Sequence, residues 1–366
     1  MKSVGLLVLS VLVVVAGLNG PVGAVFSDPG TPAALCVIQE RGSGQAMVRT
    51  VDLVSNKWTR TSGLSFPVVS PLAKATFDAD KRQFYLVAYP TPSAPPVLYQ
   101  LSLTSSLNLT ASFTSSSDFF DIEFVHKKLG GVLYVSLYFI FFCFCFLFLI
   151  FSFFKKRYGT VKTSASEISF AELHLNQKTG TVSSTPYFQL PSGLYVNSSC
   201  LSQKHQVYYA LLSPIPSSSP NSSVAGPQQL LSVAVDGPKP SAPTVVALPA
   251  PSQSGLQLLS IAFSDPTGQL YALAWDVGNQ TAVMATVDPS SGALSPLWYN
   301  NLATGPIVAD SVQHNVYEFA NNHGPAGFSV VDYDLYNSPG FSGSIKTNYP
   351  GDFQAVAASF FEEITF

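Results

Sequence analysis

The fold is decided by one stretch of sequence, Ile261-Ala262-Phe263-Ser264-Asp265-Pro266-Thr267-Gly268-Gln269-Leu270-Tyr271-Ala272-Leu273. It combines an apolar strand, a tight turn of the Asp-Pro-Thr-Gly type, and a second strand that opens on Leu-Tyr. Phe263 and Tyr271 are eight positions apart, and the hydroxyl residue Ser264 follows Phe263 directly. We call this arrangement a cassette, and its first member is the residue eight positions before the tyrosine. It recurs, with Asp or Ser after the first member, at Phe77/Tyr85, Leu201/Tyr209 and Ala309/Tyr317. Repetition of one such unit predicts a propeller or a solenoid.

A complete repeat can be written around Phe77 and Tyr85. Its four expected strands cover residues 74–77, 84–89, 97–103 and 107–113. Four antiparallel strands in a repeat of about 50 residues predict a propeller blade rather than a helical repeat. Six such blades are expected, beginning near Ala34, Lys74, Phe120, Asn197, Leu258 and Gly305.

Ring closure is predicted from the two ends of the chain. The first repeat lacks its first strand and begins directly at the strand that contains Cys36. The missing strand is supplied by Phe353–Phe360, near the C-terminus. Pairing of this segment into the first blade would hide sheet edges that otherwise aggregate. We therefore predict an all-β, six-bladed β-propeller over residues 29–366.

Three other turns share a second pattern, in which Asp or Asn opens the turn and Asn or Gly occupies a position suited to left-handed backbone. They begin at Asp52, Asn176 and Asp288. Such residues favour tight hairpins because the side chain bonds its own backbone. The order of cassette followed by hairpin supports one repeating unit.

These cassettes resemble the β-propeller superfamily over nearly all of the mature chain, without matching one of its families. Trp275-Asp276 is a solitary pair and lacks the Gly-His partner of WD40 repeats. Gly130-Gly131 does not form a kelch series, and Ser264-Asp265 does not complete a sialidase-type Asp box. The resemblance implies the architecture and leaves the activity open.

Some propeller hydrolases that resemble this architecture hold a metal with carboxylates at the central tunnel. The candidates here are Asp78, Asp265 and Asp310, together with Glu123. The alternative, which we favour, is that these acids cap turns by bonding their own backbone. The histidines fall at unrelated repeat positions, and no Gly-x-Ser-x-Gly motif is present. We predict no catalytic residue, no bound metal and no cofactor.

The repeated tyrosines could be read as an aromatic ligand site. Their constant place at the start of the second strand instead predicts packing between blades. Tyr158 belongs with this set, which is otherwise formed by Tyr85, Tyr209, Tyr271 and Tyr317.

The composition and the N-terminus indicate a secreted chain. Only 11% of residues are charged and the net charge is −3, so no basic footprint for nucleic acid is expected. Lys2 and an apolar run predict a signal peptide over residues 1–24. Four sequons agree with this route, at Asn108, Asn197, Asn221 and Asn279. The four cysteines show no metal spacing, and we expect free thiols.

An apolar block interrupts the third cassette. Val132–Phe154 holds no charge and is followed by Lys155-Lys156-Arg157, which alone would indicate a membrane span. However, cassettes and sequons continue beyond it, and removing Val132–Arg157 places Tyr158 eight positions after Phe124. Residues 132–157 are therefore interpreted as a retained intron; a real membrane span at 132–154 and a native insertion remain open.

The sequence predicts a function only in outline. We expect a secreted, non-catalytic propeller that binds an extracellular protein or a glycan. One alternative is a propeller hydrolase with a metal at the central tunnel. The other is a single-pass membrane protein, in which case the membrane becomes a partner.

Overall fold

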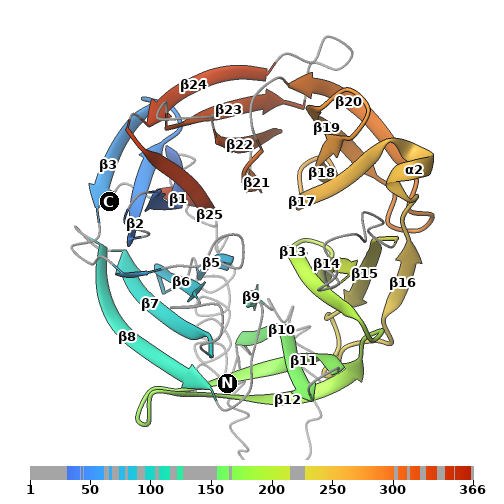
Figure 1. Cartoon of the computed structure of the whole chain (residues 1–366). Coiled ribbons are helices and arrows are strands. Elements are labelled where there is room, and N and C mark those ends of the chain that lie inside the picture. The colour runs from blue at the N-terminus through green and yellow to red at the C-terminus, as the bar shows by residue number, and fades with distance from the viewer. Residues whose placement is uncertain are drawn as a thin grey trace, which may run out of the picture.

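The computed structural model describes residues 31–41, 43, 45–61, 66–67, 74–78, 81–88, 95–103, 107–115, 122–126, 155–164, 167–214, 227–300, 304–310, 314–321, 327–335, 343–349 and 351–363. The chain folds into antiparallel β-sheets that lie radially around a central axis, as the ribbon in Figure 1 shows. The expected signal peptide, Asn221, Cys143 and Cys145 lie outside the described residues.

Three sheets have four antiparallel strands each, in sequence order. The first contains β13 (Leu194–Ser202), β14 (Val207–Pro214), β15 (Gln229–Ala234) and β16 (Thr244–Ala247). The second contains β17 (Leu256–Ser264), β18 (Gln269–Asp276), β19 (Thr281–Val287) and β20 (Leu294–Asn300). The third contains β21 (Ile307–Ala309), β22 (Asn315–Asn321), β23 (Phe328–Asp334) and β24 (Gly343–Tyr349). These sheets have the strand number and order that the repeat predicts.

A fourth sheet is twice as wide and has eight strands. Its first half contains β5 (Lys74–Asp78), β6 (Gln83–Ala88), β7 (Val97–Leu103) and β8 (Leu107–Ser115). Its second half contains β9 (Glu123–His126), β10 (Lys155–Ser164), β11 (Glu167–Asn176) and β12 (Thr181–Gln189). The halves join where β12 runs parallel to β8, with Thr181 opposite Thr114 and Val182 opposite Ser115. The described residues thus form five sheets, and the prediction of six separate ones was wrong because this junction merges two.

The fifth sheet combines the two ends of the chain. Its path is β25 (Phe353–Glu363), β1 (Thr31–Glu40), β2 (Gln45–Asp52) and β3 (Lys57–Thr61), with β4 (Phe66–Pro67) also paired to β2. β25 runs antiparallel to β1, and Cys36 lies opposite Ala358. The C-terminal strand therefore occupies the position that the sequence predicts for it, beside the strand of Cys36.

The strand register explains the eight-residue spacing of the cassettes. In each inner hairpin the cassette tyrosine pairs with the residue directly before the first member, as Tyr271 does with Ala262. The same offset pairs Tyr85 with Thr76. It also pairs Tyr158 with Glu123, although these two residues are far apart in the sequence.

The expected block of residues 132–157 ends inside a strand. β10 begins at Lys155, and Lys155 lies opposite His126 in the pairing with β9. The three basic residues at the end of the block thus belong to the sheet, while residues 132–154 lie outside the described residues. In the part of the chain that the structure describes, no helix is both long and apolar enough to cross a membrane.

The three expected hairpins have the predicted backbone. Asn56, Gly180 and Gly292 all have positive φ, at 58°, 63° and 73°. A Cβ atom at Gly292 would lie 2.7 Å from the carbonyl oxygen of Ala247, on β16 of the preceding sheet. Glycine is needed there both for its φ angle and for this close approach. The hairpin between β19 and β20 therefore packs on the outer strand of its neighbour.

The stretch Pro238–Pro251 is rich in proline, which by itself would indicate a surface loop, but part of it is a strand. It contains β16, which pairs with β15 from Thr244 opposite Ser232 onward. A Thr-Val-Val run has high β-propensity, and it fits an outer strand between the flanking prolines. The short helix α2 (Pro251–Ser254) follows it.

Candidate functional site

One buried polar position recurs at the end of the first strand of the repeat. It is fully buried in four sheets or sheet halves, at Asp78, Ser202, Ser264 and Asp310. The Asp78 carboxylate accepts from the backbone N–H of Lys81 at 3.2 Å. Ser202 Oγ accepts from the N–H of His205 at 3.0 Å. A side chain that bonds the backbone three residues ahead caps a turn, so this position shapes the inner hairpins.

Asp265 has a different role, because it reaches from one sheet to the next. It lies in the turn between β17 and β18, and its Oδ1 accepts from Ser202 Oγ at 2.5 Å. Its Oδ2 accepts from the backbone N–H groups of Gln203 at 3.0 Å and Lys204 at 3.3 Å. Both carboxylate oxygens are therefore used to bind the turn of the β13–β16 sheet. Asp265 therefore makes a polar contact between neighbouring sheets.

The predicted metal candidates are not brought together. Asp78, Asp265 and Asp310 lie in turns of three different sheets, and Glu123 accepts from Thr76 Oγ1 at 3.1 Å. Among the residues that the structure describes, no group of three or more His, Cys, Asp or Glu side chains has the geometry to hold a metal ion. The contact of Asp78 with Lys81 agrees with the turn-capping alternative, whereas Asp265 bonds the turn of the neighbouring sheet and does not cap its own.

The cassette tyrosines pack between sheets, as predicted. All five are buried, with at most 7% of the residue exposed. The clearest contact is between Tyr209 and Phe263 of the next sheet, whose rings stack at 5.3 Å with an interplanar angle of 10°. Leu258 and Leu270 join the same core cluster. In the same way, Leu201 shares a core cluster with Tyr158, and Ala309 shares one with Tyr271.

The hydroxyl groups of two of these tyrosines are held by a feature that the sequence analysis missed. Tyr271 donates to Gln269 Oε1 at 3.0 Å, and Tyr85 donates to Gln83 Oε1 at 2.8 Å. An amide side chain two residues before the tyrosine provides the acceptor. The repeated Gln-x-Tyr pattern is visible in the sequence and could have been found there.

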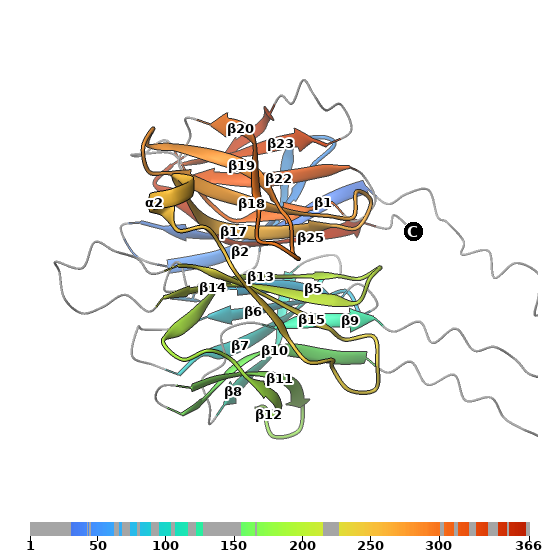
Figure 2. The same ribbon diagram turned by 90° about the vertical axis from the view of Figure 1, so that its right-hand side faces the viewer.

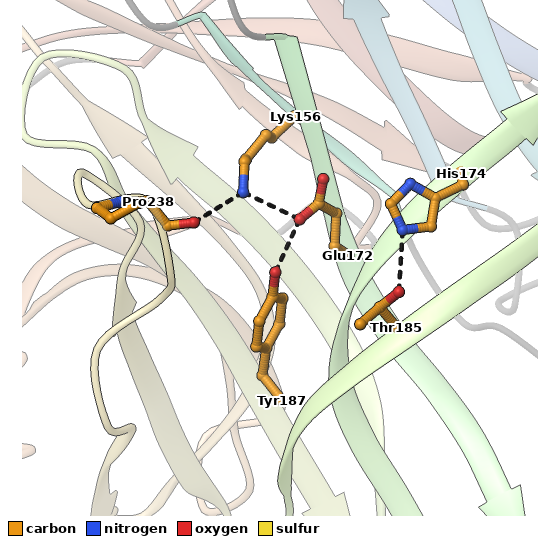
Figure 3. Close-up of polar contacts among 6 residues, drawn as sticks. All are labelled: Lys156, Glu172, His174, Thr185, Tyr187 and Pro238. Atoms are coloured by element: carbon orange, nitrogen blue, oxygen red, sulfur yellow. Dashed lines mark hydrogen bonds and ion pairs between the residues drawn. The ribbon is translucent and has the colours of Figure 1, made fainter.

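A second missed feature is a polar cluster at the seam between β10–β12 and the neighbouring sheet, drawn in Figure 3. Lys156 Nζ lies 3.1 Å from Glu172 Oε2 and donates to the carbonyl oxygen of Pro238 at 2.9 Å. Tyr187 donates to the same Glu172 oxygen at 2.8 Å. The two charged side chains are only 18% and 15% exposed. Because Pro238 follows β15, the cluster ties the start of β10 to the β13–β16 sheet.

The electrostatics of this cluster indicate a structural role. Burial, followed by the hydrogen bond to the Glu172 carboxylate, raises the pKa of Tyr187 to about 12. Tyr187 therefore stays a protonated donor at neutral pH. His174, two residues along β11 from Glu172, lies with Nε2 3.0 Å from Thr185 Oγ1 instead. The cluster was missed because Lys156 was assigned to the apolar block.

The sequons fall in contrasting environments. Asn108 and Asn279 are exposed. Asn197 is partly buried on the inner strand β13, where its Nδ2 donates to the carbonyl oxygen of Leu259 at 2.9 Å. Its own carbonyl oxygen accepts from Lys74 Nζ. Asn108 and Asn279 are therefore the accessible acceptors among the described sequons.

The two described cysteines are free thiols, as expected. Cys36 and Cys200 form no disulfide. Burial raises the pKa of both thiols well above the usual range. A thiol with a raised pKa holds little thiolate at neutral pH, so neither is suited to act as a nucleophile.

Comparison with known proteins identifies the class of fold. No protein-family model and no curated protein matches this chain. Among solved structures, a "putative 6-phosphogluconolactonase" from Bacteroides uniformis matches with a TM-score of 0.50 and 12% identity, over 90% of this chain and 99% of that one. TolB from Acinetobacter baumannii matches with a TM-score of 0.50 and 10% identity, over 90% of this chain and 66% of that one. At these identities the likeness shows the fold alone. The chain is an all-β, propeller-like protein with four-stranded antiparallel blades.

Proposed function

We propose that this chain is a secreted, non-catalytic propeller domain that binds an extracellular protein or a glycan. The observation that carries the proposal is the use of Asp265. Both of its carboxylate oxygens are bonded, to Ser202, Gln203 and Lys204. A carboxylate held between sheets in this way supports the scaffold and is poorly placed to ligate a metal as well.

We further propose that the scaffold is a closed ring of six blades. The eight-stranded sheet divides into two four-stranded units at β8 and β12, where only two residue pairs join them. The pairing of β25 with β1 supplies the first blade's inner strand. The inner strands also contact one another in cyclic order, from β25 through β5, β9, β13, β17 and β21 back to β25. These contacts support closure around the axis.

A closed ring of this kind fits a soluble glycoprotein that is secreted. His126 and Lys155 are paired neighbours, so both ends of residues 127–154 lie on the same side of any membrane. A single crossing needs about 20 residues and leaves its two ends on opposite sides. Two helical crossings would need about 40 residues, more than this segment has. The pairing therefore argues against a single-pass protein that keeps its propeller folded.

Glycan occupancy tests the compartment. In a secretory host we expect glycans at Asn108 and Asn279, which are exposed, and none at Asn197, which is partly buried and bonds the neighbouring sheet. Among the described residues, the Asn279 amide bonds only Asp276, within its own turn. Glycosidase treatment with peptide mass spectrometry measures this. An unglycosylated product, or occupancy at Asn197 in a folded protein, would contradict the assignment.

The binding role itself is tested by two screens on the purified secreted chain. We expect a reproducible ligand on extracellular protein or glycan arrays. We expect no turnover of lactone, glycoside or ester substrates, with or without added divalent metal. Metal-dependent turnover that Asp310→Asn abolishes, while a matched exposed Asp236→Asn variant stays active, would overturn the proposal in favour of a hydrolase.

A further inference from the structure

The charges of this chain are divided between two parts of the fold. Residues 74–239 contain twelve Lys or Arg and eight Asp or Glu, whereas residues 240–345 contain no Lys or Arg and seven Asp or Glu. The first segment forms the sheets from β5 to β15, and the second forms β16 to β23. A protein with a net charge of −3 therefore concentrates its cations on one side of the ring.

Four of these cations lie at one end of the sheets. We call this end the turn face, defined as the end where the first strand of each unit turns into the second and the third into the fourth. Lys81 lies between β5 and β6, Lys178 between β11 and β12, Lys204 between β13 and β14, and Lys239 between β15 and β16. All four residues are exposed. In the side view of Figure 2, α2 lies at the opposite face.

Hydrogen bonds connect the turns that carry these lysines. The N–H of Val235 donates to the carbonyl oxygen of Gln206 at 2.8 Å, which joins the loop of Lys239 to the turn of Lys204. Gln177 Nε2 donates to Gln100 Oε1 at 2.8 Å and holds the hairpin of Lys178 against β7. The turns of Lys204 and Lys239 are thus joined within one sheet, and the hairpin of Lys178 is fixed to the preceding four-stranded unit.

Two of the described acids near these lysines are bonded to other groups. None of the four lysines forms an ion pair with a residue that the structure describes. Glu172 is paired with Lys156, and the carboxylate of Asp265 is bonded to the turn of Lys204. Asp236 is exposed in the loop of Lys239, Asp78 bonds the N–H of Lys81, and Asp80 precedes Lys81 in the sequence.

We propose that Lys81, Lys178, Lys204 and Lys239 form a binding site for a linear acidic polysaccharide, one that carries carboxylate or sulfate groups; this rests on the proposed binding function and names its ligand class. Lysine ammonium groups pair with such anions without a fixed geometry. Exposed polar side chains on the same turns can bond sugar hydroxyls, at Gln177, Thr179, Gln203 and Ser241. The large exposed apolar side chains of the described residues lie outside these four turns, which disfavours a lipid surface.

The test uses immobilised heparin and polygalacturonate, with dextran as the neutral polysaccharide and polyglutamate as the acidic peptide. We expect binding to at least one acidic polysaccharide that weakens steadily between about 0.1 and 0.5 M NaCl, because salt screens exposed charges. Dextran should not bind. Each Lys→Gln change should weaken binding by roughly two- to fivefold, the effect of one exposed ion pair. The fourfold variant should lose at least tenfold.

The matched control is Arg41→Gln, which removes one charge from the β1–β2 turn at the opposite face. It should leave polysaccharide binding unchanged, and all variants should keep the wild-type melting temperature. Equal loss in Arg41→Gln, or tighter binding to polyglutamate or to acidic vesicles than to either polysaccharide, would overturn the proposal. If the array screen finds a ligand that is neither acidic nor affected by the lysine variants, this inference fails while the binding function stands.

Discussion

The bond from Asp265 to the neighbouring sheet gives the sharpest test of the structure. In Asp265→Ala, the hydroxyl of Ser202 loses its acceptor while its side chain stays fully buried. A buried donor without a partner costs about 1–3 kcal/mol. The N–H groups of Gln203 and Lys204 belong to exposed residues and can bond water instead, so they add only about 1 kcal/mol together. We expect a total loss of about 2–4 kcal/mol.

Thermal and urea unfolding of the secreted chain measure this loss. With an unfolding entropy of about 2.1 cal/mol/K per residue, 2–4 kcal/mol corresponds to a decrease of roughly 3–6 °C in melting temperature. Asp265→Asn should cost about 1–3 kcal/mol, because its NH₂ group cannot accept from the backbone N–H groups. The exposed acid Asp236 supplies the control, and Asp236→Ala should change stability by less than about 0.5 kcal/mol.

Two results would refute this reasoning. One is an Asp265→Ala variant as stable as Asp236→Ala, which would show that the contact with Ser202 contributes nothing. The other is a stability loss that appears equally when the wild-type chain is treated with a chelator. That outcome would mean that Asp265 acts through a bound metal, contrary to the turn-binding role that its hydrogen bonds indicate.

Three further predictions concern the packing of the sheets. Tyr271→Ala should destabilise the fold by about 3–5 kcal/mol in urea unfolding, because the ring is buried between sheets; a change of a few tenths would contradict this. Burial raises the pKa of Tyr209 to about 12, above its unfolded value of about 10, so its contribution to stability is complete below pH 10 and is lost as the pH rises through 10 to 12. Unfolding midpoints from pH 8 to 12 should show this decrease, and Tyr209→Phe should reduce it. Ala358→Cys should cross-link to Cys36 under mild oxidation, since these residues are directly opposite on β25 and β1. Peptide mapping without reductant detects the link, and a chain that unfolds before any link forms would count against the pairing.

Local chemistry was sufficient to predict the repeating unit. In the hairpins of Asp78, Ser202 and Ser264, a polar residue caps its own turn and a tyrosine packs at a constant register, so both features lie within about ten residues of sequence. The C-terminal strand could also be placed, because the first repeat visibly lacks a strand. Such features are predictable from sequence because their partners are near in the chain or are fixed by the repeat.

The other features of the fold and the site depend on contacts between repeats. The sequence pattern within one repeat does not show which residues of different repeats meet. The parallel pairing of Thr181 with Thr114 merges two units and requires a hairpin to meet the outer strand of its neighbour. Asp265 was read as an acid that caps its own turn, whereas its partners lie about 60 positions earlier in the chain. Lys156 and Glu172 could not be paired while Lys156 was assigned to the apolar block. A repeat pattern predicts positions within one unit, and these side chains act between units.

The register of β9 and β10 also limits how the apolar block can be interpreted. Removal of Val132–Arg157 restores the eight-residue spacing, but it would place Gly130 where Lys156 now lies, and Glu172 would lose its cation. The spacing between Phe124 and Tyr158 depends only on how many residues are removed, and not on where the removed segment begins and ends. A segment of the same length that ends at Phe154, residues 129–154, keeps the register, the strand β10 and the ion pair together. Because a partly buried carboxylate that loses its paired cation is costly, the structure favours this boundary for any segment that is absent from the mature protein.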